Sequence, residues 1–145
     1  MTRAWTPPVL LSLCGLFAAA GPARGGNLLG AAAYVLLFAL LAGAVSPLVF
    51  PRPVGAAEAL RRSADDGRPV VYWRPGCAYC LRLRLRLGRA ARRAHWVDIW
   101  RDPAGAARVR EAAAGNETVP TVVVAGRAHV NPDPAWVRAQ LGRRG

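Results

Sequence analysis

Two apolar segments without a charged side chain stand at the start of the chain. The second, residues 28–50, lies between Arg24 and Arg52 and is rich in leucine and alanine. As a helix it would reach about 35 Å, enough for the roughly 30 Å hydrocarbon core of a bilayer. Its glycines and its proline are tolerated in membrane helices, and nothing in the rest of the chain could wrap it. The pattern predicts a transmembrane helix over residues 28–50.

The first apolar segment, residues 9–20, is shorter and allows two interpretations. It starts behind Pro7-Pro8 and ends at Gly21-Pro22. It is either a short first span that forms a hairpin with the second, or the apolar region of a signal peptide with small residues near a cleavage point. We expect residues 1–52 to form a membrane anchor and residues 53–145 to form a separate domain.

The arginines predict how the chain is oriented in the membrane. Four arginines lie in residues 52–68, just after the second segment, whereas only Arg3 and Arg24 precede it. Positive charge is retained on the cytoplasmic side. We therefore expect the protein to lie in the plasma membrane with its domain facing the cytoplasm. A first segment that does not cross would place the domain outside.

Beyond the anchor, segments with the hydrophobic pattern of helices alternate with short apolar runs typical of strands. A short helix is expected over residues 56–64. Strands are expected over 69–73, 95–100, 121–125 and 128–130, with a tight turn at Gly126-Arg127 and helices from Cys77, over 103–114 and over 134–141. The order from residue 69 is β-α-β-α-β-β-α, in which the last two strands form a hairpin and the earlier ones need helical crossovers. This predicts an α/β fold with flanking helices.

One segment needs a decision between two periods. Leucine and arginine alternate over residues 81–87, which is the period of a strand. No β-branched residue occurs there, and leucine and arginine are good helix formers, so a helix is favoured. Its polar stripe would consist of Arg82, Arg86, Arg89 and Arg93. That stripe is a solvated helix face or, alternatively, a face turned to the anionic inner leaflet.

Composition changes this picture little. All 20 basic residues are arginine and the formal net charge is +12. No ordered set of basic and aromatic residues accompanies this charge, so nucleic-acid binding is not expected. The three cysteines are too few for a disulfide framework, which fits a reducing compartment.

The chemistry of the chain centres on Cys77 and Cys80. The β-rich run from Val70 to Trp73 breaks at Pro75-Gly76 and delivers a Cys-x-x-Cys pair to the start of a helix. A helix N-terminus offers unpaired N–H groups and a partial positive charge, which stabilise a thiolate. Thiols in such motifs have pKa values of roughly 3.5–7.5. The pair therefore indicates redox chemistry.

A second feature is the segment Thr118-Val119-Pro120-Thr121. Proline at the start of a strand marks an edge or a cis peptide bond. If the Val119–Pro120 bond is cis and folds beside Cys77, the backbone of Val119 can pair with an extended thiol ligand.

Together these residues resemble the glutaredoxins of the thioredoxin superfamily. The resemblance rests on residues 73–80, Val97-Asp98-Ile99, Thr118–Pro120 and Asn131-Pro132, and it covers about residues 69–141. More narrowly, the chain resembles the mycoredoxins, which serve bacteria that use mycothiol in place of glutathione. The resemblance implies a thioredoxin-like fold with a four-stranded mixed sheet.

The resemblance also implies an activity, thiol-disulfide oxidoreduction of mixed disulfides between a small thiol and proteins. Cys77 would be the nucleophile and Cys80 the resolving or regulatory thiol. Tyr79 would flank the thiol ligand, while Thr118, Val119 and Pro120 would hold it through the backbone. The expected partners are a small thiol, S-thiolated client proteins and the bilayer, with no bound cofactor. Either a second thiol or Cys80 would complete the cycle.

Two departures from the common glutaredoxin pattern bear on the co-substrate. Ala78 stands where many glutaredoxins have proline. The Gly-Gly pair with a following Asp, which many glutaredoxins use to bind glutathione, is missing after Gly126. These departures favour mycothiol, a largely uncharged sugar thiol, over glutathione as the reducing co-substrate.

Three alternatives follow from the same residues. Ala78 leaves open a glutaredoxin that bridges an iron–sulfur cluster between two subunits. The anchor leaves open a dithiol redox partner dedicated to one neighbouring membrane protein. A zinc site would need two further ligands near Cys77 and Cys80, and the two histidines, His95 and His129, lie in expected strands, so no metal is expected.

Overall fold

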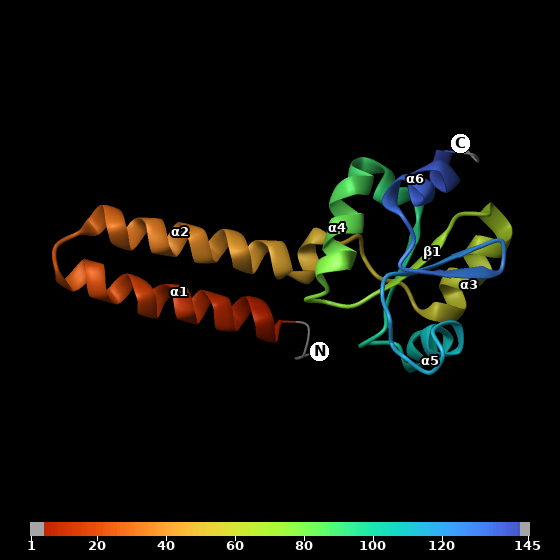
Figure 1. Ribbon diagram of the computed structural model, residues 1–145, viewed down its shortest axis with the longest axis horizontal. Coiled ribbons are helices and arrows are strands. Elements are labelled where there is room, and N and C mark those ends of the chain that lie inside the picture. Colours follow the sequence, from red (N-terminus) through yellow and green to blue (C-terminus); the bar gives the residue numbers. More distant parts are fainter. Residues whose placement is uncertain (1–4, 143–145) are drawn as a thin grey trace. The chain divides into compact units, whose positions relative to one another are not determined.

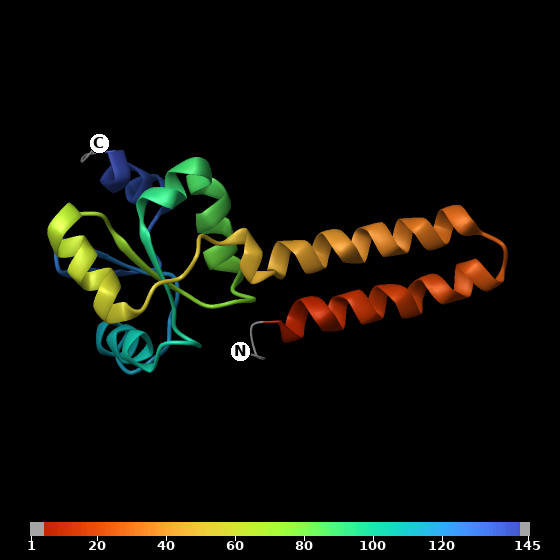
Figure 2. The same ribbon diagram turned by 180° about the vertical axis from the view of Figure 1, so that it is seen from behind.

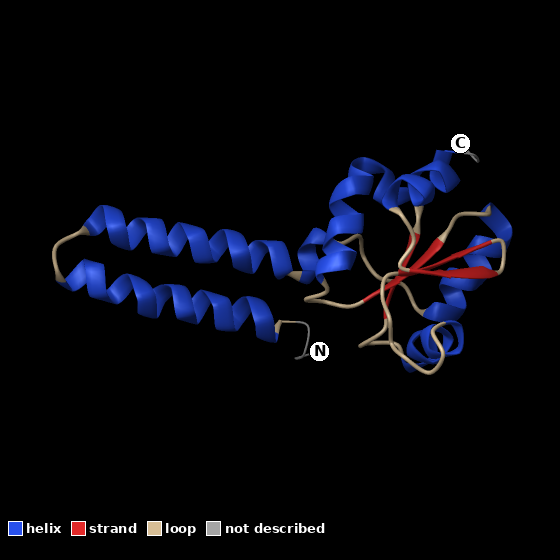
Figure 3. Cartoon of the chain, viewed as in Figure 1, coloured by secondary structure: helices blue, strands red, loops and turns tan. Residues whose placement is uncertain are grey.

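The structure is a computed structural model that describes residues 5–142, and the chain divides into two compact units between Val49 and Phe50 (Figure 1). The first unit consists of two long helices. The second contains a four-stranded sheet with helices on both faces (Figure 3).

The first unit is a hairpin of helices α1 (Thr6–Arg24) and α2 (Leu28–Val45), which run side by side (Figures 1 and 2). A Cβ atom on Gly15 would collide with the Cβ of Phe38, so the missing side chain allows the helices to approach. The helices have 19 and 18 residues and mean hydropathies of 1.4 and 2.4. By length and composition, both are candidate membrane spans.

The bounds predicted for both apolar helices were wrong. Helix α1 includes Pro7 and Pro8, because a proline in the first turn costs no hydrogen bond, and it continues past Pro22 to Arg24. Helix α2 ends at Val45 instead of residue 50. Ser46, which precedes Pro47, is extended (ψ 141°), as steric contact with a following proline requires, and a single turn, η1 (Pro47–Val49), follows.

Phe50, predicted to end the membrane helix, packs in the second unit instead. Its ring stacks on that of Trp73 with centroids 3.8 Å apart and meets Trp96 edge-on at 5.7 Å. Four residues later, the N–H of Val54 donates to the carbonyl of Trp96. Phe50 therefore belongs to the core of the second unit, and Val54 belongs to the edge of its sheet. The apolar character of Phe50 reflects its packing against two tryptophans and not contact with lipid.

The sheet has the order β2-β1-β3-β4, with β1 (Val70–Trp73) and β2 (His95–Asp98) parallel. Strands β3 (Thr121–Val124) and β4 (Arg127–Val130) form a hairpin, and β3 pairs antiparallel with β1. All four residues of β1 are buried, as expected for a central strand. The predicted four-stranded mixed sheet of a thioredoxin-like fold is confirmed.

Helices cover both faces of this sheet. Helices α4 (Ala78–Leu87) and α6 (Pro134–Gly142) lie on one face, and α3 (Ala56–Asp66) and α5 (Pro103–Ala112) lie on the other (Figures 1 and 2). The carboxylate of Asp102 connects α3 and α5. It accepts the N–H of Gly105 in α5 and the N–H of Ala56 in α3. Asp102 is therefore the N-cap of α5 and also holds the start of α3.

Two local predictions about the strands were wrong. Strand β2 ends at Asp98 rather than Trp100, since the N–H groups of Arg101 and Asp102 turn back onto the Asp98 carbonyl. The β3–β4 turn is centred on Ala125-Gly126, whose φ angles of 47° and 77° suit a hairpin turn.

The arginine stripe expected on one continuous helix is divided. The segment 81–87 is helical, as predicted, but α4 ends at Leu87. Gly88 adopts a φ of 57° there, and a 3-10 helix, η2 (Gly88–Arg93), follows. Arg89 and Arg93 therefore lie on η2 and not on α4.

Gly105 tests the packing of α5 on the sheet. A Cβ at this position would lie 2.8 Å from Cγ1 of Val97 and 3.5 Å from Cε1 of Tyr72. We expect Gly105→Ala to destabilise the second unit by about 1–3 kcal/mol, the usual range for overpacking. Urea unfolding of the full chain in detergent, followed by tryptophan fluorescence, measures this change. Gly142→Ala, also in a helix but with open space at the Cβ position, is the control and should be close to neutral.

Candidate functional site

A turn between β1 and α4 sets the position of Cys77. Strand β1 ends at Trp73, and Gly76 takes a φ of 76°, a conformation that suits glycine. Cys77 then has extended backbone angles (φ −84°, ψ 111°) and is the N-cap of α4. Its Sγ accepts the N–H of Cys80 at 3.2 Å. The sulfur thus occupies the place that a hydroxyl or carboxylate oxygen commonly takes at a helix N-terminus.

These surroundings favour the thiolate form of Cys77. The Cys80 side chain, which donates a hydrogen bond, has the largest effect, and the backbone N–H groups of Cys80 and Tyr79 and the charge of Arg74 add to it. Burial acts in the opposite direction. Together they lower the pKa of Cys77 to about 6. The pKa of Cys77 therefore lies within the range expected for thiols in such motifs.

Cys80 has the opposite character. Its side chain is fully buried, whereas that of Cys77 is partly accessible. The hydrogen bond to Cys77, burial and the nearby Cys77 charge all raise the pKa of Cys80. The pair therefore contains one accessible sulfur that ionises readily and one buried sulfur that stays protonated.

The Val119–Pro120 peptide bond is cis and lies next to Cys77. In its thiol form, Cys77 donates to the Val119 carbonyl, with Sγ and O 3.4 Å apart. Val119 and Pro120 are buried, and Thr118 is exposed. The Thr118 carbonyl accepts the hydroxyl of Thr121 at 2.8 Å.

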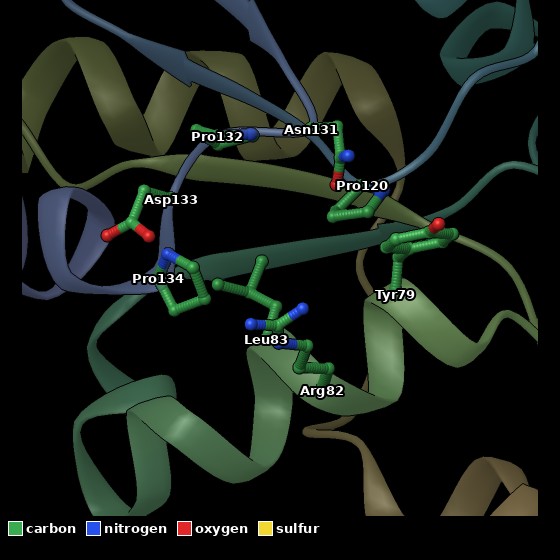
Figure 4. Close-up of a pocket in the computed structure, with 8 residues that line it drawn as sticks. All are labelled: Tyr79, Arg82, Leu83, Pro120, Asn131, Pro132, Asp133 and Pro134. Carbon is green, nitrogen blue, oxygen red and sulfur yellow. The ribbon is translucent and has the colours of Figure 1, made fainter.

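A cavity of about 250 Å³ opens beside Tyr79 and Pro120 (Figure 4). Tyr79 and Arg82 reach it from α4, Pro120 borders it from the start of β3, and Asn131 and Asp133 border it from the loop that leads into α6. Asp133 also accepts the N–H groups of Ala135 and Trp136, so its carboxylate caps α6. The cavity adjoins the Cys77 region through Tyr79 and Pro120.

The structure brings most of the predicted site residues together. Cys77, Cys80 and Val119 are linked by the contacts above, and Tyr79 and Pro120 line the adjoining cavity. Thr118 is a neighbour in the chain but does not line the cavity. Sequence reasoning assigned no site role to the remaining lining residues, which are Arg82, Leu83, Asn131, Pro132, Asp133 and Pro134. The Asn-Pro-Asp-Pro run was the available signal for the last four.

Neither histidine lies in this arrangement. His95 Nε2 pairs with Asp66 at 2.9 Å, and the His129 ring lies against Trp136 with centroids 4.3 Å apart. Across residues 5–142, no group of three or more histidine, cysteine or acidic side chains is placed to hold a metal ion.

The fold and the cysteine pair define a class: a thioredoxin-like domain with a redox-type Cys-x-x-Cys motif at a helix N-terminus. Residues 70–130 match the sequence model of the glutaredoxin family. This match leaves both helices of the first unit outside it. No curated protein and no solved structure matches the chain. The fold, the motif and the family match together support a thiol oxidoreductase with a glutaredoxin-like domain.

The ionisation of Cys77 is directly measurable. Its alkylation by iodoacetamide should rise with pH through a midpoint of about 6, because only the thiolate reacts. Cys80→Ser keeps a donor hydroxyl and should leave the midpoint close to that of the wild type. Cys80→Ala removes the side-chain donor and should raise it. Mass spectrometry of the Cys77 peptide separates this reaction from that of Cys14. A wild-type midpoint near the free-thiol value of about 8.5 would contradict the assignment.

Proposed function

We propose that this protein is a membrane-anchored thiol-disulfide oxidoreductase that reduces mixed disulfides between a small sugar thiol of the mycothiol type and proteins. The observation that supports this most strongly is the contrast between Cys77 and Cys80. A partly accessible sulfur with a pKa of about 6 lies next to Tyr79 and Pro120, which line the cavity, and beside a buried thiol whose pKa is raised. At pH 7 about nine in ten Cys77 side chains would be thiolates.

In the first step, the Cys77 thiolate attacks the small-thiol sulfur of the mixed disulfide in line. A new S–S bond forms between Cys77 and the small thiol, the old S–S bond breaks, and the client cysteine leaves as a thiolate that takes a proton from solvent. A pKa near ambient pH suits this role, because the thiol is both ionised and nucleophilic. Deprotonation also ends the donation from Cys77 to the Val119 carbonyl, which can then accept from the ligand.

In the second step, the small thiol is removed from Cys77 by one of two routes. A second small thiol, as its thiolate, attacks the small-thiol sulfur, forms the symmetrical disulfide and restores Cys77. Alternatively, the Cys80 thiolate attacks Cys77, closes an internal disulfide and releases the small thiol. Once Cys77 is in the mixed disulfide, its charge no longer raises the pKa of Cys80, but the burial of Cys80 still does; this keeps the Cys80 thiolate scarce and favours the first route.

The cavity chemistry supports a largely uncharged, hydroxyl-rich ligand. Its lining contains one cation, Arg82, and one carboxylate, Asp133, which is already engaged by the N–H groups of α6. The side-chain amide of Asn131 can both donate to and accept from hydroxyl groups. A tripeptide thiol with two carboxylates would find a single arginine, which suits it less well.

The first unit supplies the proposed anchor. At 1.5 Å per residue, the 18 residues of α2 reach about 27 Å, close to the thickness of a hydrocarbon core. Five arginines lie in residues 52–74, directly after the hairpin. By the positive-inside rule, this favours a domain that faces the cytoplasm, where small thiols keep cysteines reduced.

Thiol selectivity is tested with full-length Cys80→Ser protein in detergent, exposed separately to mycothiol disulfide and to glutathione disulfide. We expect rapid addition of one mycothiol at Cys77, reversed by excess mycothiol, and slower addition of glutathione. Intact-mass spectrometry measures both, with Cys77→Ser as the control that takes up neither. Equal or faster reaction with glutathione would assign the protein to the general glutaredoxins. Slow reaction with both would favour a dedicated protein partner.

Anchoring and orientation are tested on membranes from cells that produce the full chain. The protein should resist extraction by alkaline carbonate. A membrane-impermeant maleimide should label Cys77 in inside-out vesicles and leave it unlabelled in right-side-out vesicles. Labelling only in right-side-out vesicles would reverse the orientation, and release by carbonate would refute the anchor.

A further inference from the structure

The segment that follows the cysteine pair carries a concentrated positive charge. Residues 78–93, which make up α4 and η2, contain six arginines and no acidic residue. Outside the cavity, the side chains of Arg86, Arg89, Arg92 and Arg93 are exposed, and Leu85 beside them is 64% exposed. These five residues are called the arginine face below. Arg138 of α6 adds a further cation, since its guanidinium donates to the carbonyl of Arg86.

The arginines of this face differ from those of α3 and α5. On the opposite side of the sheet, Arg61 and Arg62 pair with Glu58, and Arg110 pairs with Glu117 at 2.6 Å. Within residues 5–142, none of the four arginines of the face forms such an ion pair. Their charge is therefore not neutralised within the described part of the chain and is available to an external anion.

The chain enters the domain on the side of the sheet that carries this face. Phe50 packs on Trp73 and Trp96. The Trp96 indole N–H donates to the carbonyl of Ala91, a residue of η2, at 2.7 Å. The first residue of the domain is thus connected to η2 through the edge-on contact of Phe50 with Trp96 and the hydrogen bond from Trp96 to Ala91. Only Ser46 and the single turn η1 lie between the end of α2 at Val45 and Phe50, so the connection between hairpin and domain is short.

We propose that the arginine face docks on the anionic lipid headgroups of the membrane in which the helical hairpin is embedded. The inference rests on the proposed anchor. Several arginines together with one exposed leucine are typical of segments that lie on a membrane surface, with the guanidinium groups on lipid phosphates and the apolar side chain at the acyl boundary. The short connection keeps the face within reach of the bilayer, where the field of anionic lipids is strong.

Docking would fix the orientation of the thiol site. Cys77 lies at the N-terminus of α4, and the arginine face begins near the C-terminus of that helix and continues along η2. With this end on the lipid, the sulfur would be held about 12 Å or more along the helix from the headgroups, given 1.5 Å per residue. Clients would then approach the site from the aqueous side or from neighbouring membrane proteins.

The test places a fluorophore on the face of the full-length protein. Leu85→Cys is labelled with bimane in a chain with Cys14, Cys77 and Cys80 replaced by serine, and is reconstituted with headgroup-spin-labelled lipid. We expect at least about threefold stronger quenching in vesicles with 30% phosphatidylglycerol than in pure phosphatidylcholine, with the difference lost in 0.5 M salt. A label at Ala57→Cys, an exposed position on α3, should show no such lipid dependence.

Charge variants decide whether the arginines cause the effect. Replacing Arg86, Arg89, Arg92 and Arg93 by glutamine should abolish the dependence on anionic lipid. The matched control replaces four ion-paired arginines of α3 and α5, Arg61, Arg62, Arg108 and Arg110, by glutamine and should retain it. With the native cysteines present, the alkylation rate of Cys77 in micelles should be unchanged in both variants, which confirms that each is folded.

Each outcome separates the docking face from the anchor. Quenching that is equal in neutral and anionic vesicles, or equal in the two charge variants, overturns the proposal and leaves the face to solvent or to an acidic protein. Release of the chain by carbonate refutes the anchor. The released chain is then added to anionic vesicles, where quenching at Leu85→Cys still supports the face and its absence overturns it.

Discussion

The hydrogen bond from the Cys80 N–H to the Cys77 sulfur connects the fold of the second unit to its chemistry. The donor is an amide of the first helical turn, which needs an acceptor whether or not the protein reacts. Helix α4 begins where this acceptor lies, so the structural requirement of the helix places a sulfur at its N-terminus. The same donor then stabilises the thiolate, since a charged acceptor forms a stronger hydrogen bond than a neutral one. The reacting atom is thus held by one of the interactions that activate it.

Sheet order explains why the sulfur meets Val119, a residue 42 positions away. Strands β1 and β3 are antiparallel neighbours, so the last residue of β1 and the first residue of β3 lie at the same end of the sheet. Cys77 follows the end of β1, and Pro120 precedes β3. The loop before α6 lines the cavity at this end of the sheet. It is held there because Asn131, which follows β4, donates its N–H to the Pro120 carbonyl at 2.7 Å. Three separate segments are joined here by strand pairing alone.

Much of this arrangement could be predicted from the sequence. The β-α-β-α-β-β-α order, the helical Leu-Arg segment and the Asp102 cap follow from local propensities, and these local signals agree with the final packing. The bounds of the apolar helices could not be predicted from hydropathy. Phe50 is as apolar as the membrane residues before it, and only its contact with Trp73 and Trp96 assigns it to the domain. Arg82 could not be assigned to the cavity, because half of the lining residues, 131–134, come about 50 residues later in the chain.

The alternation of leucine and arginine in α4 links the thiol site to the outer surface of the domain. Leu83 and Leu87 are 1% and 2% exposed and hold the helix on the sheet, as positions four residues apart on one face should. An alternation with period two cannot place every leucine on that face, so Leu85 is directed outward among arginines. In water, an exposed leucine between cations gains nothing from burial. At a lipid surface, the same leucine and arginines complement one another, and the sequence period that is unusual for a helix acquires a physical reason.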